Sequence, residues 1–592
     1  MSFRISKARV TFRAVRNASK GSGRLYRCFR TVSTSTKRGP SLSDITHPHP
    51  RVNRLLREYL AKMEQESADL PNSLQQPGYQ VKQSLPRKDR IFVNNSINLG
   101  KVDVLGFDYD YTLVSYTHKM EGLIYSMAKD YLIEHSGYPS EMKTRRMYDP
   151  RFAVRGLAVD VDRGWVLKLS YIHQIALRTV FCGRRRLSKE EVVAAYGDGA
   201  HVSPQYRNNH MKPLLDLFAL SEACLVADVL DYLNELNIHH DRQAVVEDVL
   251  QAISHVHTSG EMHKTVVRDP PTYMLPSPHL RETLMRFRDV GKKLFLCSNS
   301  NFEYVSGGLQ FLLGADWQEF FDVVIVSAGK PGFYTSNRPF RQVDKRTGKI
   351  RWTEVTTLEK GKVYSHGSLE GLTKLTGWQG PRVLYIGDQI WADLVGGRRN
   401  QGWRTGAVIR ELEYELVVQQ SKKYRQYAHQ AVTVTELLRL VQEEMEKIRT
   451  EADVRVSDGL EEYLRYLQTE MSKMFNANFG SVFRSGGEPT LFAFSLRRYA
   501  DLYLSKLENF RFYSPMHRFY PQRGISMPHD PYIPAIGRPP PATGDEKASG
   551  GQEWASVGIN AVPEDKTSRK EGRAGVSSVS CMAGGTRRRQ DS

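Results

Sequence analysis

The chain has 592 residues, of which 40% are hydrophobic and 25% are charged, and its formal net charge at pH 7 is +19. This length exceeds what a single hydrophobic core usually serves, so we expect at least two folded units. No stretch approaches about eighteen uninterrupted apolar residues, which argues against a membrane-spanning helix. The five scattered cysteines lack metal-site spacing and fit a reducing compartment.

The positive charge is concentrated at the N-terminus. Residues 1–43 contain eight Arg and three Lys and no Asp or Glu, so they supply +11 of the net charge. A segment rich in Arg, Ser and Thr and free of acids predicts a mitochondrial transit peptide. The alternative is a disordered basic arm that binds anionic surfaces, with the protein in the cytoplasm. No RNA-binding motif with interleaved aromatic residues occurs, which argues against dedicated nucleic-acid binding.

Four short apolar runs predict the strands of a parallel sheet. Each run ends in polar residues, and a helical stretch separates it from the next. This pattern indicates an α/β fold whose sheet is covered by helices on both faces. Ligands of such sheets bind at the carboxyl ends of the strands, where all four polar endings fall. The runs are VDVLGFDYDYTL (102–113), KKLFLCSNS (292–300), FDVVIVSAGK (321–330) and PRVLYIGDQIWAD (381–393).

The spacing of these strands predicts the domain organisation. About 170 residues separate the first strand from the second, far more than one crossover helix needs, so we expect an inserted cap domain. Long amphipathic helices after the core pack on the core or on a second subunit, which would make a homo-oligomer. A tail rich in Pro, Gly, Ser and charge is predicted to be disordered. The expected segments are a lead-in at 44–95, core at 96–116, cap at 117–285, core at 286–433, a helical region at 434–530 and the tail at 531–592.

Two carboxylates at the end of the first strand suggest phosphoryl transfer. Asp108 and Asp110 are two positions apart and are followed by Thr112. A carboxylate can attack phosphorus and form an aspartyl phosphate, which divides a difficult hydrolysis into two easier steps. A second carboxylate can protonate the leaving oxygen and then deprotonate the attacking water. Taken alone, the pair fits acidic turn residues equally well.

The other three strand ends add the remaining parts of a phosphate site. Ser298 and Asn299 offer hydroxyl and amide donors, and Lys330 can neutralise a phosphate. Asp388 and Asp393 have the spacing GDxxxxD, and such hard oxygen ligands suit Mg²⁺. Each element alone has another explanation: a turn, a solvated lysine or a helix N-cap. All four in this order predict a Mg²⁺-dependent phosphohydrolase.

This set resembles the four motifs of the haloacid-dehalogenase superfamily. Further segments resemble the cytosolic purine 5′-nucleotidase group, and within it the 5′-nucleotidase domain-containing proteins of types 2 and 3, over about residues 95–530. The resemblance rests on GFDYDYTL, GYP (137–139), RGL (155–157), RQVDKRTGK (341–349), YIGDQIWADL, QGWRT (401–405), FRSG (483–486) and TLFAFSLRRYADLY (490–503).

The resemblance implies a Rossmannoid three-layer core with a parallel sheet and an inserted cap, Mg²⁺ as cofactor, and hydrolysis of nucleoside 5′-monophosphates. By motif position it implies that Asp108 is the nucleophile and Asp110 the acid/base. It places Asp108, Asp110 through its carbonyl group, and Asp388 at the metal, with Asp393 in support. The implied phosphate-binding residues are Thr112, Ser298, Asn299 and Lys330.

The cap departs from the purine enzymes, so their base preference does not carry over. SYIHQIALRTVFCGRRRL (170–187) stands where those enzymes hold the base, and PQYRNNHMKPLLDLF (204–218) also differs. Phe181 is a candidate for stacking on a base, although a core phenylalanine is the more frequent explanation. His173 is a candidate for recognising the base, although a surface or core histidine with satisfied hydrogen bonds is the more frequent explanation. The expected substrate is therefore a nucleoside 5′-monophosphate or another small phosphate ester. The alternatives are a catalytically weak binding or scaffold protein and phosphotransfer to a nucleoside.

Overall fold

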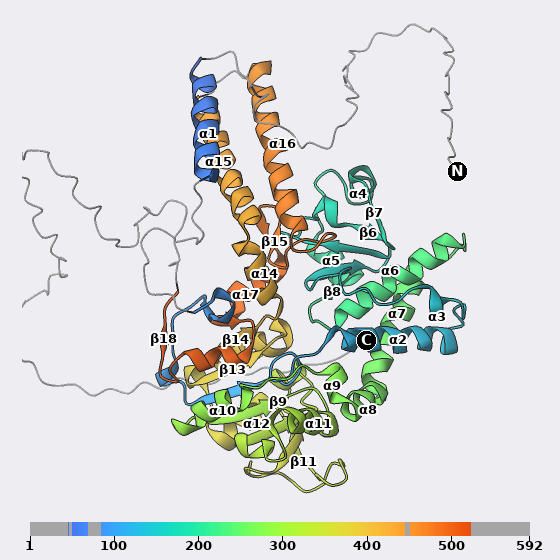
Figure 1. Ribbon diagram of the computed structural model, residues 1–592. Coiled ribbons are helices and arrows are strands. Elements are labelled where there is room, and N and C mark those ends of the chain that lie inside the picture. The colour runs from blue at the N-terminus through green and yellow to red at the C-terminus, as the bar shows by residue number, and fades with distance from the viewer. Residues whose placement is uncertain (1–44, 46–49, 69–84, 445–449, 522–592) are drawn as a thin grey trace, which may run out of the picture. The chain divides into compact units, whose positions relative to one another are not determined.

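The structure, a computed structural model, describes residue 45 and residues 50–68, 85–444 and 450–521 (Figure 1). The chain divides into two units, 1–533 and 534–592, and all described residues belong to the first. The predicted transit peptide (1–43) and the predicted tail (531–592) lie outside the described residues.

A nine-stranded sheet forms the core, in the order β1-β17-β14-β13-β3-β9-β10-β12-β11. The strands from β17 to β12 run parallel, and the two edge strands are antiparallel to their neighbours. The predicted parallel α/β sheet is therefore confirmed. Its strands are β1 (Phe92–Val93), β3 (Val104–Phe107), β9 (Lys293–Cys297), β10 (Val323–Val326), β11 (Phe340–Val343), β12 (Val363–His366), β13 (Val383–Gly387), β14 (Arg404–Val408) and β17 (Leu502–Leu504).

Both faces of the core sheet are buried, which explains its continuous apolar strands. Side chains alternate along each strand, so Val104 joins one hydrophobic cluster while Leu105 joins the other. One cluster packs against α12 (Leu369–Thr376), and α13 (Val395–Gln401) follows the GDxxxxD segment that carries Asp388 and Asp393. The other cluster includes residues of α10 (Leu280–Asp289) and α11 (Phe302–Leu313).

Between β3 and β9, residues 117–285, which are called the cap below, contain a helical part and a second sheet. The sheet is antiparallel, in the order β7-β6-β5-β4-β8, and α6 (Ala219–Glu235) is buried around most of its circumference against it and the neighbouring helices. The strands are β4 (Leu157–Asp160), β5 (Trp165–Lys168), β6 (Phe181–Cys182), β7 (Arg185–Arg186) and β8 (Met211–Leu214). The other helices are α2 (His118–His135), α3 (Met142–Arg145), α4 (Lys189–Tyr196), α5 (Pro204–His210), α7 (Arg242–Ser259), α8 (Glu261–Arg268) and α9 (Pro270–Tyr273).

Phe181 is a core residue of this second sheet and not a surface for stacking a base. It is 4% exposed, and its ring packs against Phe152 and Phe479 at centroid distances of 5.9 and 4.9 Å. His173 contacts the guanidinium group of Arg207 and does not line the cavity described below. Of the two explanations open for Phe181, the structure supports the core residue.

After α14 (Glu411–Gln420) the chain forms two long helices, α15 (Lys422–Glu444) and α16 (Glu451–Lys473). Within this chain, α15 packs against both α16 and α1 (Pro50–Ala68) (Figure 1). The chain then returns through α17 (Leu491–Tyr499) to supply β17 of the core sheet, so the region expected to be helical also contributes a strand. Two short antiparallel pairs complete the fold: β2 (Ile97–Asn98) with β18 (Arg518–Phe519), and β15 (Arg484–Ser485) with β16 (Glu488–Pro489).

Two further expectations concern membranes and cysteines. Among the described residues, no helix is both long enough and apolar enough to cross a membrane. Cys182, Cys224 and Cys297 are buried free thiols.

Candidate active site

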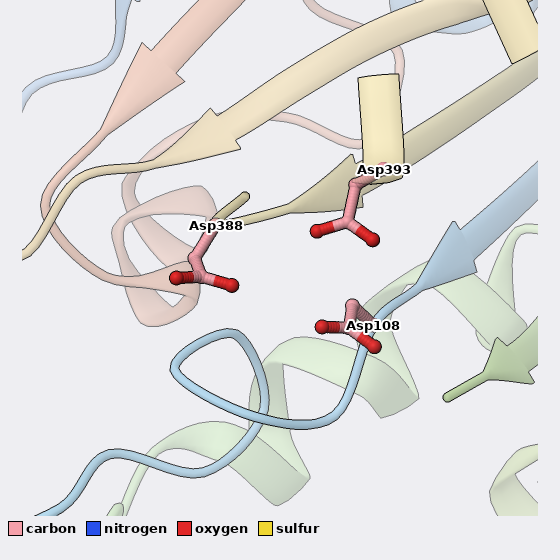
Figure 2. Close-up of side chains that lie close together, drawn as sticks. All are labelled: Asp108, Asp388 and Asp393. Atoms are coloured by element: carbon pink, nitrogen blue, oxygen red, sulfur yellow. The ribbon is translucent and has the colours of Figure 1, made fainter. Parts of the chain in front are cut away.

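Adjacent strands bring three carboxylates together at one edge of the core sheet. Asp108 directly follows β3, and Asp388 directly follows the neighbouring strand β13. The backbone N–H of Asp108 donates to the carbonyl of Ile386 over 2.9 Å, which extends the ladder and fixes the first loop. One oxygen atom each of Asp108, Asp388 and Asp393 lies within 4.8 Å of the others (Figure 2).

Lys330 joins two of these carboxylates. Its Nζ atom lies 2.7 Å from Oδ1 of Asp108, 2.6 Å from Oδ1 of Asp393 and 3.1 Å from the hydroxyl of Tyr385. Burial acts to lower the pKa of Lys330, but Asp108 and Asp393 outweigh it and hold that pKa well above its usual range. Lys330 is therefore a permanent cation at the base of the site.

Asp393 is held from both sides. It lies in a π-helical turn (Ile390–Leu394), a form that occurs often at functional sites. Its Oδ1 atom binds Lys330, and its Oδ2 atom accepts the backbone N–H of Gln389 over 3.0 Å. Gly387 permits this approach, because a Cβ atom there would lie 2.4 Å from Oδ2 of Asp393. These contacts fix the orientation of Asp393.

The electrostatics of the cluster fit a bound divalent cation. Burial raises the pKa of Asp108 and outweighs the opposite effect of Lys330. Burial also raises the pKa of Asp388 well above its usual range and outweighs the opposite effect of Arg155. A cation among these carboxylates would favour their charged forms. Carboxylate oxygens are the ligands that Mg²⁺ prefers, so the donor set fits the predicted ion.

Asp110 lies beside this cluster in a polar setting of its own. Its Oδ1 atom accepts the hydroxyl of Tyr116 over 2.5 Å, and its Oδ2 atom accepts the hydroxyl of Ser300 over 2.6 Å. Tyr304 in turn donates to the hydroxyl of Tyr116 over 3.0 Å. Burial raises the pKa of Asp110, and the hydrogen bonds from Ser300 and Tyr116 partly offset that rise. A carboxyl group with a raised pKa suits a general acid.

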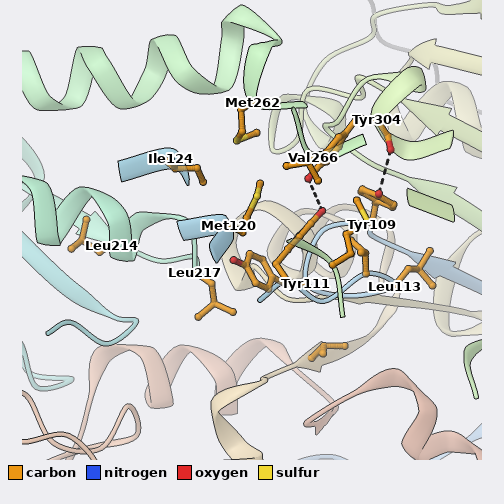
Figure 3. Packing of buried hydrophobic residues seen from close by; sticks show 14 of the residues in the cluster. Tyr109, Tyr111, Leu113, Met120, Ile124, Leu214, Leu217, Met262, Val266 and Tyr304 are labelled. Carbon is orange, nitrogen blue, oxygen red and sulfur yellow. Dashed lines mark hydrogen bonds between the residues drawn. The ribbon is translucent and has the colours of Figure 1, made fainter. Parts of the chain in front are cut away.

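Hydrophobic packing fixes the loop that carries Asp110. Tyr109, Tyr111 and Leu113 are buried beside residues of the cap, including Met120 and Met262 (Figure 3). Tyr111 has a φ angle of 52°, in the left-handed region that non-glycine residues rarely adopt. Such backbone strain persists where the surroundings determine the conformation, often at active sites.

The predicted phosphate-binding residues occupy two kinds of position. Asn299 exchanges two hydrogen bonds with the backbone of Lys330, at 2.9 and 2.7 Å, and both residues line the cavity. Ser298 is fully buried, and its hydroxyl accepts the N–H of Ser300. The buried hydroxyl of Thr112 has no hydrogen-bond partner in the described part of the chain. Ser298 and Thr112 are thus close to the site in sequence but do not line the cavity.

The cavity has a volume of about 480 Å³ and is bounded by both parts of the protein. The core contributes Asp108, Asp110, Asn299, Lys330, Asp388 and Asp393, which are six of the eight predicted site residues. The cap contributes Asp216, Phe218, His257 and His263. Burial lowers the pKa of His257, although Asp216 acts in the opposite direction. A carboxylate, a phenyl ring and two imidazoles of the cap therefore line the same cavity as the carboxylates of the core.

Comparison with known proteins shows the family of the chain. A sequence model of the 5′ nucleotidase family matches residues 91–532, about three quarters of the chain. The chain belongs to the 5′-nucleotidase family. It is 38% identical to a 5′-nucleotidase domain-containing protein of Dictyostelium discoideum over 74% of both chains. It is also 38% identical to 5′-nucleotidase domain-containing protein 2 of Rattus norvegicus and 37% identical to that of Homo sapiens, over 74% of this chain and 80% and 85% of theirs.

Solved structures of two hydrolases are also similar. A haloacid dehalogenase-like hydrolase from Bacteroides fragilis has 15% sequence identity and a TM-score of 0.21, over 52% of this chain and 87% of its own. A magnesium-bound hydrolase of the same type from Bacillus subtilis has 13% identity and a TM-score of 0.20, over 52% and 86%.

In this member of the 5′-nucleotidase family, the cavity is also lined by residues that the sequence did not single out. Ser300 is the most accessible of them to prediction, because it follows Ser298 by two positions at the same strand end. Phe218 precedes α6, whereas His257 and His263 lie in the consecutive helices α7 and α8, so the ring and the two imidazoles are far apart in the sequence. No pattern in the sequence assigns them to one wall.

Proposed function

We propose that this protein is a Mg²⁺-dependent phosphohydrolase that acts on nucleoside 5′-monophosphates or similar small phosphate monoesters through an aspartyl-phosphate intermediate. Membership of the 5′-nucleotidase family supports phosphohydrolase chemistry. The single observation that carries the proposal is that Asp108, Asp110, Lys330 and Asp388 line one cavity. A nucleophile, an acid/base, a fixed cation and a metal carboxylate together can hydrolyse a phosphate monoester.

Asp108 and Asp388 would hold the Mg²⁺ ion, together with the backbone carbonyl of Asp110 that the family resemblance implies. Asp393 would support them, because both of its carboxylate oxygens already bind protein donors. When bound, the ion would neutralise charge on the phosphoryl oxygens and so reduce their repulsion of the nucleophile.

The residues of the chain divide the reaction between them. A carboxylate oxygen of Asp108 attacks phosphorus, the bond to the ester oxygen breaks, and Asp110 gives its proton to that oxygen. Asp110 then takes a proton from water, whose oxygen attacks the aspartyl phosphate and releases phosphate with Asp108 restored. Lys330 and Asn299, which line the cavity, would contact the phosphoryl oxygens. Ser298 and Thr112 would add hydroxyl groups from more deeply buried positions.

The cap wall favours a leaving group of nucleoside size. A volume of about 480 Å³ lies within the usual range for small-ligand sites. Phe218 offers a ring face or edge to a base, while Asp216 and His257 offer acceptors and donors to sugar hydroxyl groups. These groups do not indicate a purine over a pyrimidine.

Phosphate release from a panel of nucleoside 5′-monophosphates tests the proposal. Wild type with Mg²⁺ should release phosphate from at least one of them, and both EDTA and Asp108→Asn should abolish that release. Release by wild type that does not exceed that of Asp108→Asn on any substrate would favour a binding or scaffold protein.

For location, we propose import into mitochondria, on the basis of the acid-free, Arg-rich composition of residues 1–43. A fusion of these residues to a fluorescent reporter should be found in mitochondria. A diffuse cytosolic signal would contradict this.

A further inference from the structure

Arg155 belongs to the cap but reaches the catalytic edge of the core. It directly precedes the Gly156 turn into β4, and its side chain is fully buried. Its Nη1 atom donates to the carbonyl oxygen of Asp388 over 3.2 Å and to Oδ2 of the same residue over 3.4 Å. Asp388 and Arg155 are 233 positions apart in the sequence.

Two other contacts fix the direction of this guanidinium group. Its Nε and Nη2 atoms bind the two carboxylate oxygens of Glu411, at 2.8 and 2.6 Å. Its plane also lies over the ring of Phe492, 4.9 Å from the ring centroid. A bidentate pair between Arg and a carboxylate sets an orientation as well as an energy. Nη1 is therefore directed at Asp388 by contacts that do not involve Asp388.

The contact restrains one oxygen of Asp388 and leaves the other for a ligand. Within the described residues, no protein hydrogen bond reaches Oδ1 of Asp388, whereas Arg155 holds Oδ2 and the backbone carbonyl. A carboxylate held by one oxygen presents its second oxygen in a fixed direction. Groups that orient metal ligands in this way commonly change metal affinity about 10–100-fold when removed.

We propose that Arg155 is a positioning residue that orients Asp388 and thereby sets the affinity of the site for a divalent cation. This inference rests on the proposed function, because it assumes that Asp388 is a metal ligand. It assigns to a cap residue a role in the core site, so the position of the cap and the geometry of the metal carboxylate are linked through one side chain.

Arg155 is not the only attachment of the cap, so its removal should leave the cap in place. Lys168 of β5 donates to the carbonyls of Phe479 and Arg484 over 2.8 and 2.6 Å. Asn476 and Asn478 donate to the carbonyls of Arg151 and Phe152 over 2.8 and 3.2 Å. Variants of Arg155 should therefore fold with the cap attached.

Calorimetric titration of the full chain with Mg²⁺ alone tests the inference. Arg155→Met should raise the Kd for Mg²⁺ about 10–100-fold. Arg155→Lys should raise it less, because lysine keeps the positive charge. The matched control is Arg184→Met, since Arg184 also forms a bidentate pair, with Asp228 at 2.6 and 2.8 Å, and lies 4.0 Å over the ring of Phe152. It should lower the melting temperature and leave the Kd unchanged.

Each result has one reading. An unchanged Kd in Arg155→Met would overturn the inference, and so would a tighter one, which would mean that the guanidinium group only competes with the ion. If Arg155→Met does not fold, Glu411→Gln replaces it, because loss of the bidentate anchor should also weaken the Kd; no weakening there overturns the inference. No Mg²⁺ binding by wild type would overturn the proposed function itself.

Discussion

The ammonium group of Lys330 bridges Asp108 and Asp393, with distances of 2.7 and 2.6 Å to their Oδ1 atoms. The three residues come from three separate strand ends, and all are buried. Breaking a buried ion pair on one side leaves uncompensated charge, so this bridge matters for stability as well as for chemistry.

Lys330→Met should abolish phosphate release, with kcat reduced about 100-fold or more, because a fixed positive charge at the developing phosphoryl charge is lost. The measurement is steady-state phosphate release with Mg²⁺ present. Lys292→Met is the control, since Lys292 is also buried and its ammonium group donates to the backbone carbonyl of Leu99 over 2.7 Å, away from the cavity. Equal losses of kcat in the two variants would mean that Lys330 has only a structural role.

Gly387→Ala should inactivate the protein through a contact with Asp393. A Cβ atom at Gly387 would lie 2.4 Å from Oδ2 of Asp393, so that carboxylate must move away from Lys330 and the N–H of Gln389. We expect kcat to fall about 100-fold in a phosphate-release assay. In Gly406→Ala, on the next strand, the Cβ atom would lie 3.0 Å from Cδ1 of Leu502 and 3.2 Å from Cγ1 of Ile386. These contacts do not involve Asp393, so this variant should keep most of the activity. Comparable activity in the two variants would contradict this account of Asp393.

Phe218→Ala should raise the KM for nucleotides more than the KM for small phosphate esters. The ring lines the cavity on the cap side, 5.5 Å from the ring of His257. Loss of this contact should raise KM for a nucleoside 5′-monophosphate about tenfold, within the range expected for a lost apolar contact. The KM for p-nitrophenyl phosphate should change less. An equal change in KM for both substrates would show that the ring does not contact the leaving group.

We expect Glu415 to make the stability of the protein depend on pH. Its carboxylate accepts the hydroxyl of Ser481 over 2.7 Å and the N–H of Val482 over 2.6 Å. Burial raises the pKa of Glu415 from 4.5 to about 7, and these hydrogen bonds only partly oppose it. Between about pH 4.5 and pH 7, the folded protein therefore keeps a proton on Glu415 that the unfolded chain has lost. The contribution of this group to stability is complete below about pH 4.5 and is lost as the pH rises to about 7.

Glu415→Gln removes this titration. Between pH 5 and pH 7, the free energy of unfolding of wild type relative to the variant should fall by about 1–3 kcal/mol. Burial lowers the pKa of the nearby Lys168 to about 7, so the titration of Lys168 changes the free energy of unfolding mainly above pH 7. Urea denaturation of both proteins at the two pH values measures the difference. A difference that does not vary with pH would contradict the prediction.

The sequence was sufficient to predict the core because its chemistry lies in local patterns. Asp108 and Asp388 directly follow an apolar strand, and Lys330 lies four positions after the end of another, Val326. Parallel strands bring such endings to one edge. Contacts of the cap are different in kind. Arg155 and Asp388 are 233 positions apart, and Phe218 is far in the sequence from His257 and His263, so only tertiary packing brings these residues together. The spacing of residues along the sequence does not predict such long-range contacts.

The C-terminal region shows the same limit. The long apolar periodicities of α15 and α16 predicted helices, and these helices exist. The three-residue strand β17 is too short to stand out in the sequence, yet it extends the core sheet beside β14. Asp501, just before it, accepts the N–H of Thr405 over 3.0 Å, a contact that also requires the fold to be known.

Mass spectrometry of the acid-quenched reaction tests most directly whether Asp108 takes up the phosphoryl group. The full-length protein would be mixed with Mg²⁺ and a nucleoside 5′-monophosphate that it hydrolyses. The reaction would be quenched within one turnover and the protein digested. We predict a peptide that contains Asp108 and carries the added mass of one phosphoryl group, with fragment ions that place it on Asp108 and with no such peptide from Asp108→Asn. Turnover by wild type with the phosphoryl group on another residue, or equal turnover by Asp108→Asn, would contradict the mechanism.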